Sequence, residues 1–175
     1  TLSDVDNSAP STGLVIVAQT ATNGVWKYSL DGVTWSTVSL ELVLDSSNYL
    51  AFIPDGNNGG TSTLDVRGWD QYSDTTAPSA GSTVTISSTG GSSPYSALTS
   101  TLSIVVSDVN DAPEWPAATN GSSFTGVTED DTNNAGNLVS GLLNLQDSDN
   151  DSNADRGVAI FATDIGSNGT GSWEF

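Results

Sequence analysis

Residues 25–38, VWKYSLDGVTWSTV, contain two short runs of strand-forming residues on either side of Asp31-Gly32. An Asp-Gly pair between two such runs is a strong signal for a β-hairpin, because glycine readily adopts the positive φ angle that a tight turn requires. The stretch therefore predicts two antiparallel strands, Val25 to Leu30 and Val33 to Val38.

Similar runs recur along the chain at the spacing of a β-sandwich. They are Gly13 to Ala18, Leu40 to Leu44, Tyr49 to Ile53, Thr61 to Trp69, Val84 to Ile86 and Leu98 to Val106. Beyond the proline-containing segment Ser107 to Trp115, we expect strands at Asn137 to Leu145 and at Val158 to Ala162. Helix-forming residues are too scattered for long amphipathic helices. We therefore predict an all-β fold, an antiparallel sandwich with part of a second repeat.

The charge of the 175-residue chain limits its partners. There are 21 acidic and only 3 basic side chains, so the formal net charge is −18. Nucleic acid and anionic membranes are not expected partners, because binding phosphate requires clustered lysine or arginine. No apolar run approaches the ~20 residues of a membrane span, so membrane insertion is not expected either. With no histidine and no cysteine, thiol and Ser-His-Asp catalysis and most zinc sites are excluded.

The acidic residues are mostly aspartate, which with asparagine supplies short oxygen ligands in loops. A charge of this size opposes a compact state unless cations relieve it. Two explanations are consistent with this charge: bound divalent ions, or a salt-adapted surface whose carboxylates are simply solvated. Because many of the acids cluster in tight loops that contain asparagine, we prefer bound ions.

The second half of the chain repeats features of the first. Asp147-Ser-Asp-Asn matches Asp4-Val-Asp-Asn at a spacing of 143 residues, Gly157 to Ala162 matches Gly13 to Ala18, and Gly171 to Phe175 matches Gly24 to Tyr28. Three matches in one order indicate an internal repeat. A second alignment sets Ser3 to Pro10 against Ser107 to Pro113 as two linkers, but it matches fewer features.

This repeat divides the chain at residue 111. Residues 1–111 are expected to form one sandwich repeat that lacks its opening segment, and residues 112–175 to form the first part of the next repeat. An edge strand missing from the first repeat would leave an open template for pairing. Residues 112–146 could fill that place in the same chain or in a neighbour. The alternative is a complete first sandwich followed by a partly ordered tail.

The loop from Asp147 to Asp155 presents an oxygen ligand at every second position. Its potential ligands are Asp147, Asp149, Asp151, Asn153 and Asp155. The pattern resembles the first nine positions of an EF-hand or thrombospondin-type calcium loop. It departs from the EF-hand at Ser152, where glycine is expected, and at Val158, where the bidentate glutamate belongs. The alternative is a solvated turn. Only D-x-D-N is shared with the copy at Asp4 and Asp6.

The segment Asp108-Val-Asn-Asp-Ala-Pro resembles the D-x-N-D-N-x-P linker of cadherins and cadherin-like bacterial repeats, with Ala112 in place of the second asparagine. In that family the linker binds Ca²⁺ between β-sandwich domains, together with an early acidic pair and a D-x-D loop. The ligands that the resemblance implies are Asp108, Asn110 and Asp111 in the linker, Glu129 and Asp130 as the acidic pair, and Asp147 and Asp149, or Asp4 and Asp6, as the loop. Asp70 is a further candidate that could instead cap a strand.

The chain as a whole resembles repeats of large, type-I-secreted RTX adhesins of Gram-negative bacteria. The matching elements are G-x-W-x-Y-S-x-D-G-x-x-W at Gly24 to Trp35, F-x-P-D at Phe52 to Asp55, R-x-W-D at Arg67 to Asp70, and V-N-D-A-P at Val109 to Pro113. The resemblance implies a calcium-stiffened adhesion module on the cell surface, with cofactor Ca²⁺. Its partners would be neighbouring repeats, and a glycan or protein receptor. Folding of such a chain would be coupled to the extracellular calcium that it binds.

A different function is suggested by the aromatic residues. Five of them could form part of a stacking face for sugar rings, as in carbohydrate-binding modules: Trp26, Trp35, Trp69, Tyr72 and Tyr95. We take Trp69 and Tyr72 as the candidate ligand-binding residues. Packing in the core is the alternative, and for Trp26 and Trp35 we prefer it. Catalysis is not expected, because no pair of carboxylates is set apart near an apolar cleft.

Overall fold

A computed structural model describes residues 12–71, 77–114, 124–143, 149–151, 154–155, 157–160 and 162–163. The chain divides into two compact units, Thr1–Val109 and Asn110–Phe175. Among the described residues, no helix is long and apolar enough to cross a membrane. Asp4, Asp6, Tyr72 and Asp147 lie outside the described residues.

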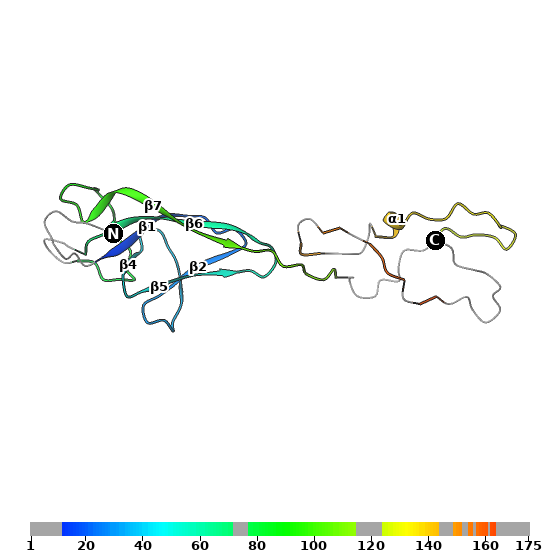
Figure 1. Ribbon diagram of the computed structural model, residues 1–175, viewed down its shortest axis with the longest axis horizontal. Helices are drawn as coiled ribbons and strands as arrows, with labels where there is room; N and C mark the ends of the chain where they lie inside the picture. The colour runs from blue at the N-terminus through cyan, green and yellow to red at the C-terminus, as the bar shows by residue number, and fades with distance from the viewer. Residues whose placement is uncertain are drawn as a thin grey trace. The chain divides into compact units, whose positions relative to one another are not determined.

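The first unit contains seven described strands and the second one short helix (Figure 1). The strands are β1 (Gly13–Gln19), β2 (Gly24–Ser29), β3 (Ser36–Thr37), β4 (Val43–Asp45), β5 (Tyr49–Pro54), β6 (Gly60–Trp69) and β7 (Tyr95–Val106). The helix is α1 (Val139–Leu143).

These strands form two antiparallel sheets. One sheet has four strands in the order β4-β1-β6-β7, and the other has three in the order β3-β2-β5. Every strand pair is antiparallel. Figure 1 shows β1, β6 and β7 running side by side, with β2 and β5 in the other layer. The predicted all-β fold with two antiparallel sheets is confirmed.

The main core lies between the two sheets. Ile16 and Leu64, which are 0% exposed, face it from the four-stranded sheet. Trp26 and Phe52 face it from the other sheet, where their rings meet edge to face with centroids 5.1 Å apart. Fully buried and half-buried residues alternate along β6, which places Ser62, Leu64 and Val66 inward.

The hairpin at Asp31-Gly32 differs from its prediction. β2 ends at Ser29, and its partner β3 comprises only Ser36–Thr37 instead of Val33 to Val38. The Asp31 side chain explains this difference. Its carboxylate accepts hydrogen bonds from the amides of Val33 and Thr34 at 2.8 and 2.7 Å. Amides engaged in this way do not pair with β2.

Three other predicted strands are wrong in the described residues. Asn137 to Leu145 contains helix α1 instead of a strand. Val84 to Ile86 forms no strand, although neighbouring Thr83 makes an isolated bridge to Leu42. Val158 to Ile160 carries no strand, and Val158 and Ile160 are 45% and 76% exposed. A strand needs a partner as well as apolar residues, and no described strand pairs with this last segment.

Candidate metal site

Asp108, the first acidic residue of the linker, is held by the first unit. One of its carboxylate oxygens accepts a hydrogen bond of 2.8 Å from the Gly59 amide, in the turn between β5 and β6. This contact uses a ligand oxygen that the family resemblance assigns to calcium. The sequence alone did not indicate Gly59 as the partner, although the Asn57-Asn58-Gly59-Gly60 run marks a turn there.

In the second unit, Asp111 of the linker meets the acidic loop. The Asp111 amide donates a hydrogen bond of 2.9 Å to Oδ2 of Asp151, which lies 40 residues further along the chain. The Asp151 amide in turn donates to Oδ1 of Asp149 at 2.9 Å. Asp151 thus connects the linker to Asp149 of the D-x-D loop, two elements that the family resemblance expects to share a calcium ion.

Asp111 and Asp151 each have one more carboxylate oxygen, and these two oxygens are the strongest indication of a bound cation at the site. Oδ2 of Asp111 and Oδ1 of Asp151 are both buried and accept no hydrogen bond. Removing a carboxylate oxygen from water without a partner is costly, and such groups normally pair or coordinate a metal. The chemistry fits Ca²⁺, which takes six to eight oxygens from carboxylates, carbonyls and water. In that role Asp111 and Asp151 would each contribute one carboxylate oxygen.

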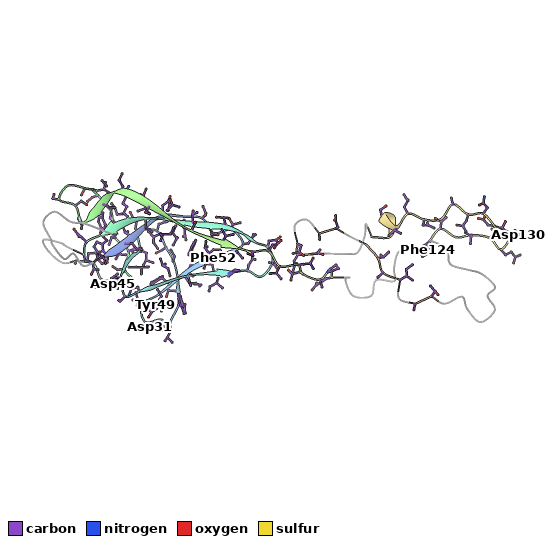
Figure 2. The ribbon with its side chains drawn as sticks, in the orientation of Figure 1. Asp31, Asp45, Tyr49, Phe52, Phe124 and Asp130 are labelled. Atoms are coloured by element: carbon purple, nitrogen blue, oxygen red, sulfur yellow. The ribbon has the colours of Figure 1, made fainter. Side chains whose placement is uncertain are left out.

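The remaining predicted ligands of this unit are placed differently. Asn110 is exposed, and its side-chain amide donates 2.6 Å to the carbonyl of Asp111. Glu129 and Asp130 are exposed in a turn that the Asp131 amide closes on the Thr128 carbonyl at 3.1 Å. Figure 2 places Asp130 at the tip of its loop. Over the described parts of the chain, no three acidic side chains come together as a metal-holding group.

Asp70 belongs to the first unit, directly after β6. Its backbone amide donates to the Pro94 carbonyl at 3.2 Å, which connects the end of β6 to the start of β7. Burial raises the pKa of the nearby Tyr95 phenol, and the charges of Asp70 and Glu41 raise it further. The Asp70 backbone therefore secures the end of β6, and whether its side chain caps the strand or binds a metal stays a prediction.

The sugar-binding prediction is wrong for Trp69. Its side chain is 1% exposed and packs with Val15, Val43 and Tyr95 in a second core cluster. Trp26 and Tyr95 are also buried, at 6% and 8% exposure. Trp69 and Tyr95 pack with Val15 and Val43 on the face of the four-stranded sheet that points away from the main core. Trp26 lies in the main core between the two sheets, so none of these three rings presents a stacking surface. Among the five aromatic residues, the described part of the chain leaves only Trp35 substantially exposed, at 42%.

Among the described acidic residues of the first unit, Asp31 accepts the most hydrogen bonds that involve its side chain. Besides the amides of Thr34 and Val33, its carboxylate accepts hydrogen bonds from the hydroxyls of Ser29 and Thr34 at 2.9 and 3.1 Å. These bonds, led by the Thr34 amide, hold the pKa of Asp31 well below its ordinary value of 3.8. Both carboxylate oxygens already have donors, so Asp31 stabilises a turn and is not a candidate ligand.

Comparisons of the chain with family models, with curated proteins and with solved structures gave no match. The functional assignment therefore rests on the residues and on their arrangement.

Proposed function

We propose that this chain is a calcium-binding structural and adhesion module of a large secreted cell-surface protein. In this proposal the sandwich is of the cadherin or immunoglobulin type, and it belongs to an RTX-like adhesin. Ca²⁺ bound beside the linker stiffens the connection to the neighbouring repeat. The fold class and the linker motif support this assignment, and the acidic composition supports binding of cations rather than anions.

The observation that carries the proposal is the pair of buried, unpartnered oxygens on Asp111 and Asp151. They lie at two positions where calcium ligands were expected independently, the linker and the alternating aspartate loop. A bound cation would supply the missing partner of both oxygens. Asp149 orients the loop, because it accepts the hydrogen bond from the Asp151 amide.

Calcium binding would also make folding of the chain depend on whether it is inside or outside the cell. A metal that binds only the folded state adds its binding free energy to folding. At low calcium, the self-repulsion of a chain with net charge −18 opposes compaction. At the millimolar calcium found outside cells, the site would fill and the linker would become rigid.

A calcium titration followed by thermal melts tests this function. The full chain is melted in EGTA and then at increasing Ca²⁺, with Mg²⁺ as the ionic control and circular dichroism as the signal. We expect a rise in melting temperature that Ca²⁺ produces and Mg²⁺ does not. An identical melt in EGTA and in millimolar Ca²⁺ would contradict the proposal.

Two variants assign the effect to the site. Asp111→Asn and Asp151→Asn retain an oxygen acceptor but remove the charge, and each should weaken the apparent calcium affinity about tenfold or more, on the order of 1.4 kcal/mol. Asp55→Asn is the matched control, because Asp55 accepts a similar local hydrogen bond from the Asn57 amide at 3.0 Å. Wild-type affinity in both site variants would show that calcium binds elsewhere.

A further inference from the structure

Strand β7 forms one edge of the four-stranded sheet, and no described strand pairs with its outer side. It is the longest of the described strands, with 12 residues, and among them it pairs with β6 alone. The edge of a sheet presents a row of unpaired backbone donors and acceptors, which is a ready template for another strand.

The other sheet edges carry features that discourage pairing, whereas β7 does not. β4 and β3 have only three and two residues, and β4 ends in Asp45. The edge strand β5 ends in Pro54. The sequence of β7, YSALTSTLSIVV, contains no charged residue and no proline over its whole length. Short strands, charges and prolines are the usual protection of an edge, so β7 is suited to accept a partner.

The inward face of β7 is also incompletely covered. Leu102 lies opposite Leu64, and Ile104 lies opposite Ser62. These β6 residues are buried, at 0% and 1% exposure, while Leu102 and Ile104 are 41% and 37% exposed. The three-stranded sheet therefore covers the inward face of β6 but leaves that of β7 partly open.

Only part of the edge is free to pair. The Arg67 guanidinium donates to the carbonyls of Ser96 and Ala97 at 2.9 and 2.6 Å, and the Ser96 hydroxyl donates to the Leu98 carbonyl at 2.6 Å. The register with β6 also shifts in this region, and it is regular from Thr99 to Val106. An added strand would therefore pair with that regular stretch.

We propose that the β7 strands of two copies of this chain pair antiparallel, joining two four-stranded sheets into one. Ser103 lies on the two-fold axis in this arrangement. Leu102 is then opposite Ile104 of the second copy on the inward face, and Thr101 is opposite Val105 on the outward face. The pairing brings the exposed apolar side chains of both copies together, and such cross-strand pairs stabilise a sheet.

Electrostatics favour a second copy at this edge. Two chains of net charge −18 repel each other, so they can approach only where the local charge is low. β7 itself is uncharged, and the adjacent β6 offers one acidic and one basic side chain, Asp65 and Arg67. Asp65 is engaged with Thr101, whose hydroxyl lies 2.5 Å from its carboxylate.

Cysteine cross-linking tests this register directly, because the chain contains no native cysteine. Ser103→Cys places two thiols opposite each other at the axis, and mild oxidation should produce a disulfide-linked dimer. Thr99→Cys is the matched control on the same face of the same strand. It lies four residues from the axis, or roughly 13 Å along the strand, so its two thiols stay apart. Both positions are exposed.

Sedimentation over a concentration series provides the second test. The wild-type chain should show a dimer that is lost in Leu102→Lys/Ile104→Lys, since a lysine at an edge opposes pairing. Val33→Lys is the control, because Val33 is 80% exposed in a loop outside β7. Circular dichroism establishes that each variant is folded.

If the lysine variant does not fold, the cross-linking result alone decides whether the β7 strands of two copies pair. A monomer at every concentration, or equal cross-linking of Ser103→Cys and Thr99→Cys, would overturn the proposal. So would a folded lysine variant that is still dimeric, because the contact would then involve another segment, such as residues 112–146. These outcomes report on the pairing of β7 and not on calcium binding at Asp111 and Asp151, so either proposal can fail while the other stands.

Discussion

Gly59 and Asp108 approach each other closely at the end of the first unit. The Gly59 amide donates a hydrogen bond of 2.8 Å to the Asp108 carboxylate. A Cβ atom on Gly59 would lie 2.6 Å from the Asp108 backbone nitrogen and 2.7 Å from the Val106 carbonyl oxygen. The contact therefore requires a glycine at position 59 and an acceptor at position 108, and it secures the chain just beyond β7.

Replacing the acceptor should weaken the first unit whether or not calcium is present. Asp108→Ala removes the partner of the Gly59 amide, and we expect a loss of about 1 kcal/mol in unfolding free energy. Thermal or urea unfolding in EGTA measures it. Asp108→Asn retains an oxygen acceptor and should lose less. If Asp108→Ala changes stability only when calcium is added, Asp108 acts as a metal ligand and its structural role is refuted.

Adding a methyl group to Gly59 should be more damaging. Gly59→Ala forces the backbone of the turn away from Asp108 and Val106, and we expect a cost of about 1–3 kcal/mol. Gly126→Ala is the control, because a Cβ there meets nothing within 4 Å. Urea denaturation of both variants makes the comparison. Equal stability of the two would mean that the turn relaxes freely.

The Asp31 turn predicts a specific dependence of stability on pH. Because hydrogen bonds hold its pKa below the ordinary value of 3.8, the ionised form is favoured in the folded state. Its contribution is complete above that value and decreases as the pH falls below it toward the folded pKa. The difference in melting temperature between the wild type and Asp31→Asn should therefore narrow below about pH 4.

Titration of the Asp31 carboxyl by NMR tests whether its lowered pKa is the cause of this pH dependence. The pKa should lie below that of an unperturbed aspartate, and Thr34→Ala should raise it slightly, because only the hydroxyl bond is lost. A midpoint near 4 for Asp31 would contradict the hydrogen-bond network as described.

Core packing predicts that truncating two leucines, Leu64 and Leu98, will have very different effects on the free energy of unfolding. Leu64 is fully buried between the sheets, while Leu98 is 83% exposed. Leu64→Ala should cost about 2–5 kcal/mol, and Leu98→Ala should stay within about 0.5 kcal/mol of wild type. Chemical denaturation of both variants measures the difference. Similar losses would contradict the assignment of Leu64 to the core.

Local sequence predicted strands well where a strand has partners on both sides. Residues 13–18 and 61–69 were expected as strands and form β1 and β6, the two central strands of the four-stranded sheet. It failed where a side chain competes for the backbone, as at Asp31, or where an apolar run has no paired neighbour, as at Val158 to Ile160. Alternation of apolar residues reports burial on one face and says nothing about the presence of a partner strand.

At the candidate metal site too, the sequence predicted some features and only the folded structure shows the others. Residue type and spacing alone indicated the linker aspartates and the alternating acidic loop, because oxygen ligands in loops have a recognisable pattern. The identity of the pair that meets, Asp111 and Asp151, follows from folding across 40 residues. Trp69 is a similar case. Its residue type suggested sugar binding, but only the folded structure shows that it is buried in the second core cluster.

The sequence by itself determined the all-β class, the acidic character and the positions of the oxygen-rich loops, since these depend on composition and short-range pattern. The tertiary structure alone decided which strands lie at the edges, which aromatic residues are buried and which carboxylate oxygens lack a partner. Each of those properties depends on contacts between residues far apart in the chain, and local preference cannot specify such contacts.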